Sequence, residues 1–242
     1  MKNTFKKLFI SFTVLSLTAC SSTTMQDNTF AAKENKDFTK YTNQLVVEYA
    51  ENDYTTMHQF FEHPEDYGID INNVDVSLGE FYTDNTEEIK EDQKELNKFN
   101  RSTLDKTQQT IYDELKYENE LSLKAENKKF QYLNNCWSTM SGLHQSLISV
   151  FSEYILRNEK DIQDLITLIN DVPRYTNDVL EYTKEQADKN TLQFDYDSVT
   201  QDIQDVINNK ADSSITSALY NAIDALNLDE EKTTSYKAQV KD

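Results

Sequence analysis

Residues 143–155 read Leu-His-Gln-Ser-Leu-Ile-Ser-Val-Phe-Ser-Glu-Tyr-Ile, and apolar side chains return in this run every three or four positions. Seven of them fall on or beside one face of a helix: Leu143, Leu147, Ile148, Val150, Phe151, Tyr154 and Ile155. An apolar face of this width is typical of an amphipathic helix that packs against a protein core. The run therefore predicts a helix that begins near Leu143.

The same helical period recurs along most of the chain. It is found in residues 38–49, 57–61, 86–99, 103–132, 159–172, 173–182, 199–207, 215–226 and 229–240. With only three glycines and two prolines, the chain offers few of the tight turns that sheet proteins need. Val74 and Val76 alternate with acidic residues and suggest one brief strand. We predict an all-α fold, an irregular bundle of about eight helices.

Two helix boundaries can be predicted from local chemistry. Asn158 followed by Asp161 resembles a capping box, in which each side chain bonds the backbone N–H of the other residue. The next boundary is expected at Asp171-Val172, because Pro173 suits the first turn of a new helix. The sequence thus predicts two consecutive helices between Asn158 and Tyr182.

The first twenty residues contain a basic N-terminal region, an apolar run over residues 8–17 and small residues at a possible cleavage site. These are the three parts of a secretory signal peptide. The apolar run is too short to span a bilayer, which takes about 20 residues. It ends in Leu17-Thr18-Ala19-Cys20, which resembles the lipobox of bacterial lipoproteins, where the cysteine is acylated and becomes the mature N-terminus. The alternative is a chance cysteine at an ordinary cleavage site. We expect cleavage after Ala19 and a lipid such as palmitate on Cys20.

This reading divides the chain into a signal peptide at 1–19, a lipid-anchored tether at 20–37 and a helical domain at 38–242. The tether is polar and aperiodic, and a flexible segment of this length reaches roughly 20 Å. The helical domain is therefore expected outside the cytoplasm, held to the bacterial cell membrane, or to an outer membrane if the envelope has one.

The formal charge of −19 limits the possible partners. Such a chain repels phosphate backbones and anionic lipid surfaces, so nucleic acid is excluded and the acyl chains must supply the membrane affinity. The 14 tyrosines and 12 phenylalanines argue against disorder despite the acidity.

Few residues are candidates for chemistry. His58, Glu62 and His63 form one candidate zinc site, but His63 precedes a proline and points away from the helical face that His58 and Glu62 share. Glu65 and Asp66 follow, but neither is a convincing fourth ligand, so we expect a partly exposed pair of loop histidines and no bound metal. Cys136 has no basic neighbour to lower its pKa, which favours a packing thiol over a nucleophile.

Two residues are weak candidates for ligand contact. His144 follows Gly142 at the start of the amphipathic run, where it either reaches a ligand or simply lies at the helix boundary. Trp137 either stacks on a ligand or packs beside a long helix, and packing is the commoner role. No catalytic constellation is recognised in the sequence.

Six short segments, in this order and spacing, resemble the N-terminal part of a bacterial family catalogued as domain of unknown function 885. They are residues 111–115, 141–145, 152–154, 161–165, 171–175 and 228–232. The resemblance implies an α-helical, zinc-metallopeptidase-like protein, often an exported lipoprotein. Full members are more than twice as long, and their expected metal site is a His-Glu-x-x-Pro-Gly-His motif in the C-terminal half.

This sequence contains no such motif. The resemblance therefore implies an N-terminal helical portion, truncated before the metal motif and inactive alone, which would form one wall of a substrate cleft. Its partners would be a peptide substrate or the missing C-terminal domain, and zinc is expected only in a full-length member. The alternative is a self-sufficient surface binding or scaffold lipoprotein for a peptide or protein partner.

Overall fold

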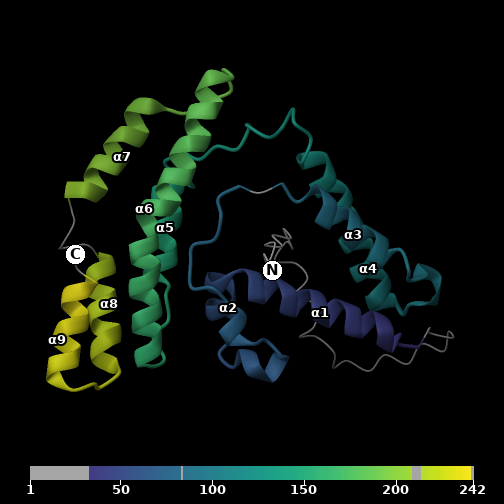
Figure 1. The fold of residues 1–242 in the computed structure, drawn as a ribbon, viewed down its shortest axis with the longest axis horizontal. Helices are drawn as coiled ribbons and strands as arrows, with labels where there is room; N and C mark the ends of the chain where they lie inside the picture. The colour runs from purple at the N-terminus through teal and green to yellow at the C-terminus, as the bar shows by residue number, and fades with distance from the viewer. Residues whose placement is uncertain (1–32, 83, 209–213, 241–242) are drawn as a thin grey trace. The chain divides into compact units, whose positions relative to one another are not determined.

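The computed structural model describes residues 33–82, 84–208 and 214–240, and these form helices joined by turns, with no strand among them (Figure 1). The α-helices are α1 (Lys36–Asn52), α2 (Tyr54–Phe60), α3 (Thr86–Leu96), α4 (Lys106–Ala125), α5 (Leu143–Ser152), α6 (Glu159–Asp188), α7 (Tyr196–Asn208), α8 (Ser214–Ala225) and α9 (Glu230–Gln239). Short 3₁₀ turns lie at Pro64–Tyr67, Ile71–Asn73 and Arg101–Thr103. The all-α prediction is confirmed, whereas the brief strand expected at Val74 is not formed. None of the described helices is long and apolar enough to cross a membrane.

The chain divides into two compact units. Of the described residues, unit 1 holds 33–52, 64–73 and 84–131, and unit 2 holds 53–63, 74–82, 132–208 and 214–240. The signal peptide, Cys20 and most of the expected tether lie outside the described residues.

Unit 1 is built on the pairing of α3 with α4 and on the first turns of α1. Phe38, Leu96 and Leu104 are completely buried in its core, and each contributes about 1.5–3 kcal/mol through removal from water. Gln108 closes the capping box of α4 with Asp105, and its side chain also bonds the backbone of Asn35 at the start of α1. The amide thus holds the beginnings of two helices together.

Unit 2 contains the longest described helix, α6, which runs for 30 residues and continues through Pro173. The sequence-based expectation that the helix ends at Asp171-Val172 was therefore wrong. Proline removes one backbone bond, but Leu168 before it and Val179 after it are completely buried on the same helix. Because Pro173 itself is exposed, burial of the opposite face keeps the helix continuous.

The link between α5 and α6 begins earlier than the amphipathic run suggested, because α5 ends at Ser152. The predicted capping box at Asn158 is present, and it requires extended backbone there, with φ −156° and ψ 176°. The carboxylate of Asp161 also accepts bonds from the N–H groups of Arg157 and Asn158, at 2.7 and 3.0 Å. Tyr154 and Ile155 therefore lie on a short non-helical link instead of a last helical turn.

A buried core in unit 2 surrounds Cys136, Val179 and Tyr182. The segment before Thr83 is held to α6 at its middle, where Asp171 accepts a bond from Leu78 N and Arg174 donates to Gly79 O, both at 2.8 Å. At the other end of the unit, α8 packs against both α5 and α9.

Candidate functional site

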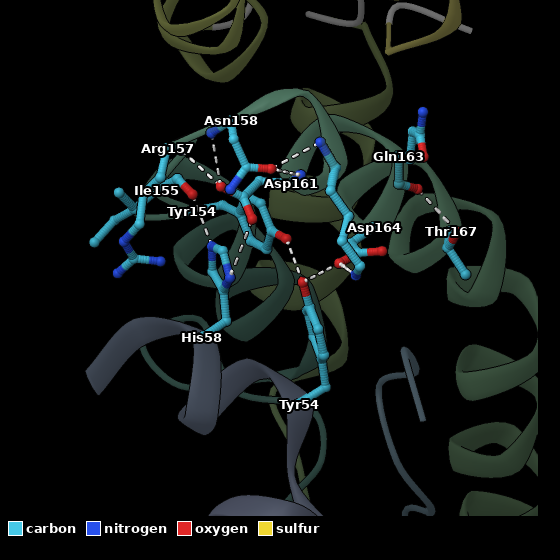
Figure 2. Close-up of polar contacts among 11 residues, drawn as sticks. Tyr54, His58, Tyr154, Ile155, Arg157, Asn158, Asp161, Gln163, Asp164 and Thr167 are labelled. Atoms are coloured by element: carbon cyan, nitrogen blue, oxygen red, sulfur yellow. Dashed lines mark hydrogen bonds and ion pairs between the residues drawn. The ribbon is translucent and has the colours of Figure 1, made fainter. Parts of the chain in front are cut away.

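A polar cluster joins α2 to the link between α5 and α6 within unit 2 (Figure 2). The hydroxyl of Tyr54 donates to Asp164 Oδ2 at 2.8 Å, and it lies 2.9 Å from the hydroxyl of Tyr154. Since a phenol has a single O–H donor and that of Tyr54 is directed at Asp164, Tyr154 is the donor in the second bond. The three groups form a directed chain from Tyr154 through Tyr54 to the carboxylate.

The first turn of α2 places Tyr54 for this contact. Asp53 is the N-cap, and its side chain accepts bonds from Thr56 N at 3.0 Å and from the hydroxyl of Thr55 at 2.7 Å. Tyr54 and His58 lie four residues apart on α2 and therefore share a helix face. The cap thus fixes the side of the helix that meets the link.

His58 is buried in the cluster and stacks on two tyrosines. Its ring is nearly parallel to that of Tyr154, with centroids 4.2 Å apart, and lies 5.6 Å from that of Tyr54. Nε2 is 2.7 Å from the carbonyl oxygen of Ile155, which can only accept, so Nε2 carries a proton. Burial lowers the pKa of His58, and the ring is neutral at pH 7. The expected pair of partly exposed loop histidines is wrong for His58, although His63 is exposed beyond the end of α2.

The carboxylates of the cluster are occupied. Asp164 pairs with Lys160 one turn earlier on α6 and accepts the hydrogen bond that the hydroxyl of Tyr54 donates. Asp161 accepts the hydrogen bond of Asn158 N in the capping box of α6, and its Oδ1 lies 3.9 Å from His58 Nδ1. Burial, with the neighbouring hydroxyl and carboxylate, raises the pKa of Tyr54, and burial also raises that of Tyr154, so both phenols stay protonated. Within the described ranges, no three His, Cys, Asp or Glu side chains are placed to hold a metal ion.

A pocket of about 150 Å³ opens beside the stacked rings. Its lining comes from α2, α5 and the link: Thr55, His58, Gln59, Ser149, Val150, Glu153 and Tyr154. Glu153 is exposed, and among the described residues its carboxylate accepts a single hydrogen bond, from the Gln59 amide at 3.5 Å. The pocket therefore combines an aromatic wall, an apolar side chain and a carboxylate that pairs with no cation among the described residues.

The weak ligand candidates from the sequence lie elsewhere in unit 2. The side chain of His144 is 9% exposed, its Nε2 lies 3.9 Å from Asp202 of α7, and neither ring nitrogen has a hydrogen-bond partner within the described residues. Trp137 is half-buried against the Cys136 core, and its indole N–H donates to Thr183 at 2.7 Å. Neither residue lines the pocket.

Cys136 is a packing residue in the structure. It is buried, its thiol lies 3.7 Å from the carbonyl oxygen of Asn134, and burial raises its pKa to about 11. A thiol held protonated in this way is a poor nucleophile. The lipobox residues, including Cys20, fall outside the described part of the chain.

Comparison with known proteins adds the family. The profile of a family described as bacterial protein of unknown function (DUF885) matches residues 72–242. The chain belongs to the DUF885 family. No curated protein and no solved structure matches it. The DUF885 match includes α5, the link and α6, while α2, which supplies the other wall of the pocket, lies before it.

Sequence reasoning did not assemble this site. Gln59 and Glu153 carry no motif, and they are 94 positions apart in the chain. One signal was available, because Glu153 and Tyr154 fall in one of the segments that resemble DUF885, and Asp161 and Asp164 fall in another. The segments that resemble the family thus supply Glu153 and Tyr154 of the pocket lining, together with Asp161 and Asp164 of the adjoining polar cluster.

Proposed function

We propose that this DUF885 chain is an exported, lipid-anchored protein that binds a peptide segment in the pocket of unit 2 and does not cut it. The pocket beside the stacked His58 and Tyr154 rings is the observation that carries the proposal. The buried chain of bonds from Tyr154 to Asp164 supports it, because those bonds hold the pocket wall in place before any ligand arrives.

The size of the pocket suggests what part of a ligand enters it. Sites for drug-sized molecules and cofactors run from about 300 to 1,000 Å³. A cavity of about 150 Å³ holds an object the size of one aromatic ring. We therefore infer that one side chain of a larger ligand is inserted, while the rest of that ligand stays on the surface.

We infer that the chain does not cleave the bound peptide, because its candidate catalytic groups are engaged in other contacts or buried. The protonated Nε2 of His58 is engaged by Ile155, and the thiol of Cys136 is buried with a raised pKa. The sequence has no His-Glu-x-x-Pro-Gly-His motif. In a longer family member that carries the motif, zinc and peptide cleavage would belong to that separate part.

The same pocket serves either of two forms of the proposal. In the first, which we favour, the chain is a self-sufficient binding lipoprotein, because each unit has its own buried core around Leu104 or Val179. In the second, the chain is the N-terminal helical portion of a metallopeptidase-like protein and forms one wall of its cleft. A monomer that unfolds cooperatively supports the first form, and aggregation of the purified chain supports the second.

Peptide binding is tested with a fluorescent positional-scanning peptide library and the purified full-length chain. Ser149→Trp fills the pocket from an exposed position, whereas Ser146→Trp places the same ring one turn away on α5 as the control. We expect Ser149→Trp to weaken binding about tenfold or more and Ser146→Trp to leave it unchanged. Bound peptide should be recovered intact by mass spectrometry. Equal binding by Ser149→Trp, or chelator-sensitive cleavage, would contradict the proposal.

A further inference from the structure

We infer that the pocket of unit 2 selects a basic side chain, the ammonium group of lysine or the guanidinium group of arginine, and places its charge on Glu153. This inference rests on the peptide-binding function proposed above and names the ligand class. Three properties of the pocket carry it: an uncompensated carboxylate, an aromatic wall without charge, and a size that suits one long side chain.

The carboxylate of Glu153 has no cationic partner among the residues that the structure describes. Asp164 is paired with Lys160, and Asp161 accepts two backbone N–H groups of the link. Glu153 receives a single long bond from the neutral amide of Gln59 and forms no ion pair within the part of the chain that the structure describes. A cation that enters the pocket would therefore gain a new charge-assisted hydrogen bond without breaking an existing ion pair.

The stacked rings suit a cation with an aliphatic stem. The face of a tyrosine ring attracts an ammonium or guanidinium group, and the methylenes of lysine or arginine pack on apolar neighbours such as Val150. His58 is buried and neutral at pH 7, so the histidine of this wall does not repel a positive ligand. The charge of −19 on the whole chain adds a long-range attraction for such ligands.

Arg157 is a positive charge that competes with the ligand. It stands on the same link, and its charge acts on both His58 and Tyr154. Its guanidinium forms no ion pair within the described residues, and Arg157 does not line the pocket. Removal of this charge should therefore strengthen the binding of a basic ligand, an effect that a purely apolar pocket would not show.

The test measures binding of Nα-acetyl-lysine amide, whose side-chain ammonium is free, and of Nα-acetyl-norleucine amide. Binding to the full-length chain is measured by isothermal titration calorimetry. The two probes have nearly the same shape and differ by the charge. We expect the lysine probe to bind about tenfold more tightly, and added salt to reduce the difference. Glu153→Gln should remove the preference, while Glu120→Gln, the same change at an exposed position of α4 in unit 1, should keep it. Arg157→Gln should raise the affinity for the lysine probe about twofold to threefold.

The outcomes separate the two proposals. If both probes bind equally to the wild-type chain and to Glu153→Gln, and Ser149→Trp still blocks them, the inference is overturned and peptide binding stands. If neither probe binds and the peptide library gives no binder, both proposals fail. If n-butylammonium binds as tightly as the lysine probe, selection for a cation is supported and the ligand is a free amine instead of a peptide.

Discussion

The hydroxyl groups of Tyr54 and Tyr154 lie 2.9 Å apart, although one hundred positions of chain separate the two residues. This bond joins α2 to the link before α6, and Asp164 completes it from α6 itself. A pocket wall held in this way depends on segments that are distant in sequence, so its loss should be measurable as a loss of stability.

Removal of the Tyr54 hydroxyl should destabilise unit 2. Tyr54→Phe leaves the carboxylate of Asp164 without its phenol donor and the hydroxyl of Tyr154 without its acceptor. We expect a loss of about 1–3 kcal/mol in the free energy of unfolding, measured with urea. Tyr117→Phe, at a 61% exposed tyrosine, is the control and should change stability by less than about 0.5 kcal/mol. Equal effects of the two substitutions would show that the hydroxyl chain contributes nothing.

His58 should make the stability depend on pH. Its folded pKa is lowered by burial from the ordinary value of 6.5, so the unfolded chain binds more protons between the two pKa values. The stabilising effect of the neutral ring is complete above the unfolded pKa and is lost as the pH falls from 6.5 toward the folded pKa. We expect the free energy of unfolding to fall by at most about 1.4 kcal/mol per pH unit in this range.

Urea unfolding at a series of pH values measures this slope. His58→Phe keeps an aromatic ring in the stack but cannot be protonated, so the slope between about pH 7.5 and about pH 5.5 should become flatter. His63→Gln replaces an exposed histidine and should keep the wild-type slope. An unchanged slope in His58→Phe would assign the pH dependence to another group.

Arg174 should hold the segment before Thr83 on α6. Its guanidinium makes two bonds to Asp171, at 2.6 and 2.7 Å, and one to Gly79 O. Because the side chain is 44% exposed, solvent screens the pair, and Arg174→Ala should cost only about 0.5–1 kcal/mol. The clearer result is expected in amide hydrogen exchange, which should rise in residues 74–82. Lys184→Ala, which removes an exposed pair with Glu181, should leave that exchange unchanged.

Cys20 should determine where the protein resides. Metabolic labelling with an alkyne analogue of palmitate should mark the wild-type chain in the membrane fraction, because acylation supplies about 0.8 kcal/mol per buried CH₂. Cys20→Ala should abolish the label and move the chain out of that fraction. Cys136→Ala removes the other thiol and should affect neither result. If the Cys20→Ala chain still carried the palmitate analogue, acylation at Cys20 would be refuted.

The sequence predicted features whose causes are local. The capping box at Asn158 needs only two side chains three residues apart, and the amphipathic period reports which face of a helix is buried. Pro173 was misread because its tolerance depends on burial of Leu168 and Val179, which the local sequence does not express. The early end of α5 has the same kind of cause, since the capping of α6 and the contacts of α2 hold Tyr154 outside a helix.

The pocket could not be predicted because its parts meet only through tertiary packing. His58 reaches Ile155 over a separation of 97 positions, and no pattern near His58 reports the stacked tyrosine. Once a zinc site with Glu62 and His63 was set aside, the sequence left His58 as one of a partly exposed pair, whereas the folded chain buries it as an aromatic ring.

The uninterrupted course of α6 has a mechanical consequence. A helix of 30 residues is about 45 Å long, with Asp164 near its beginning and Tyr182 near its end. Pro173 stands at its middle and leaves the carbonyl of Ile169 without a helical partner, so elastic bending is easiest there. A bend of about 10° at this joint would displace one end by roughly 4 Å. Such a bend would strain the Tyr54 bond at one end and the Cys136 core at the other, so the two ends of unit 2 resist deformation together.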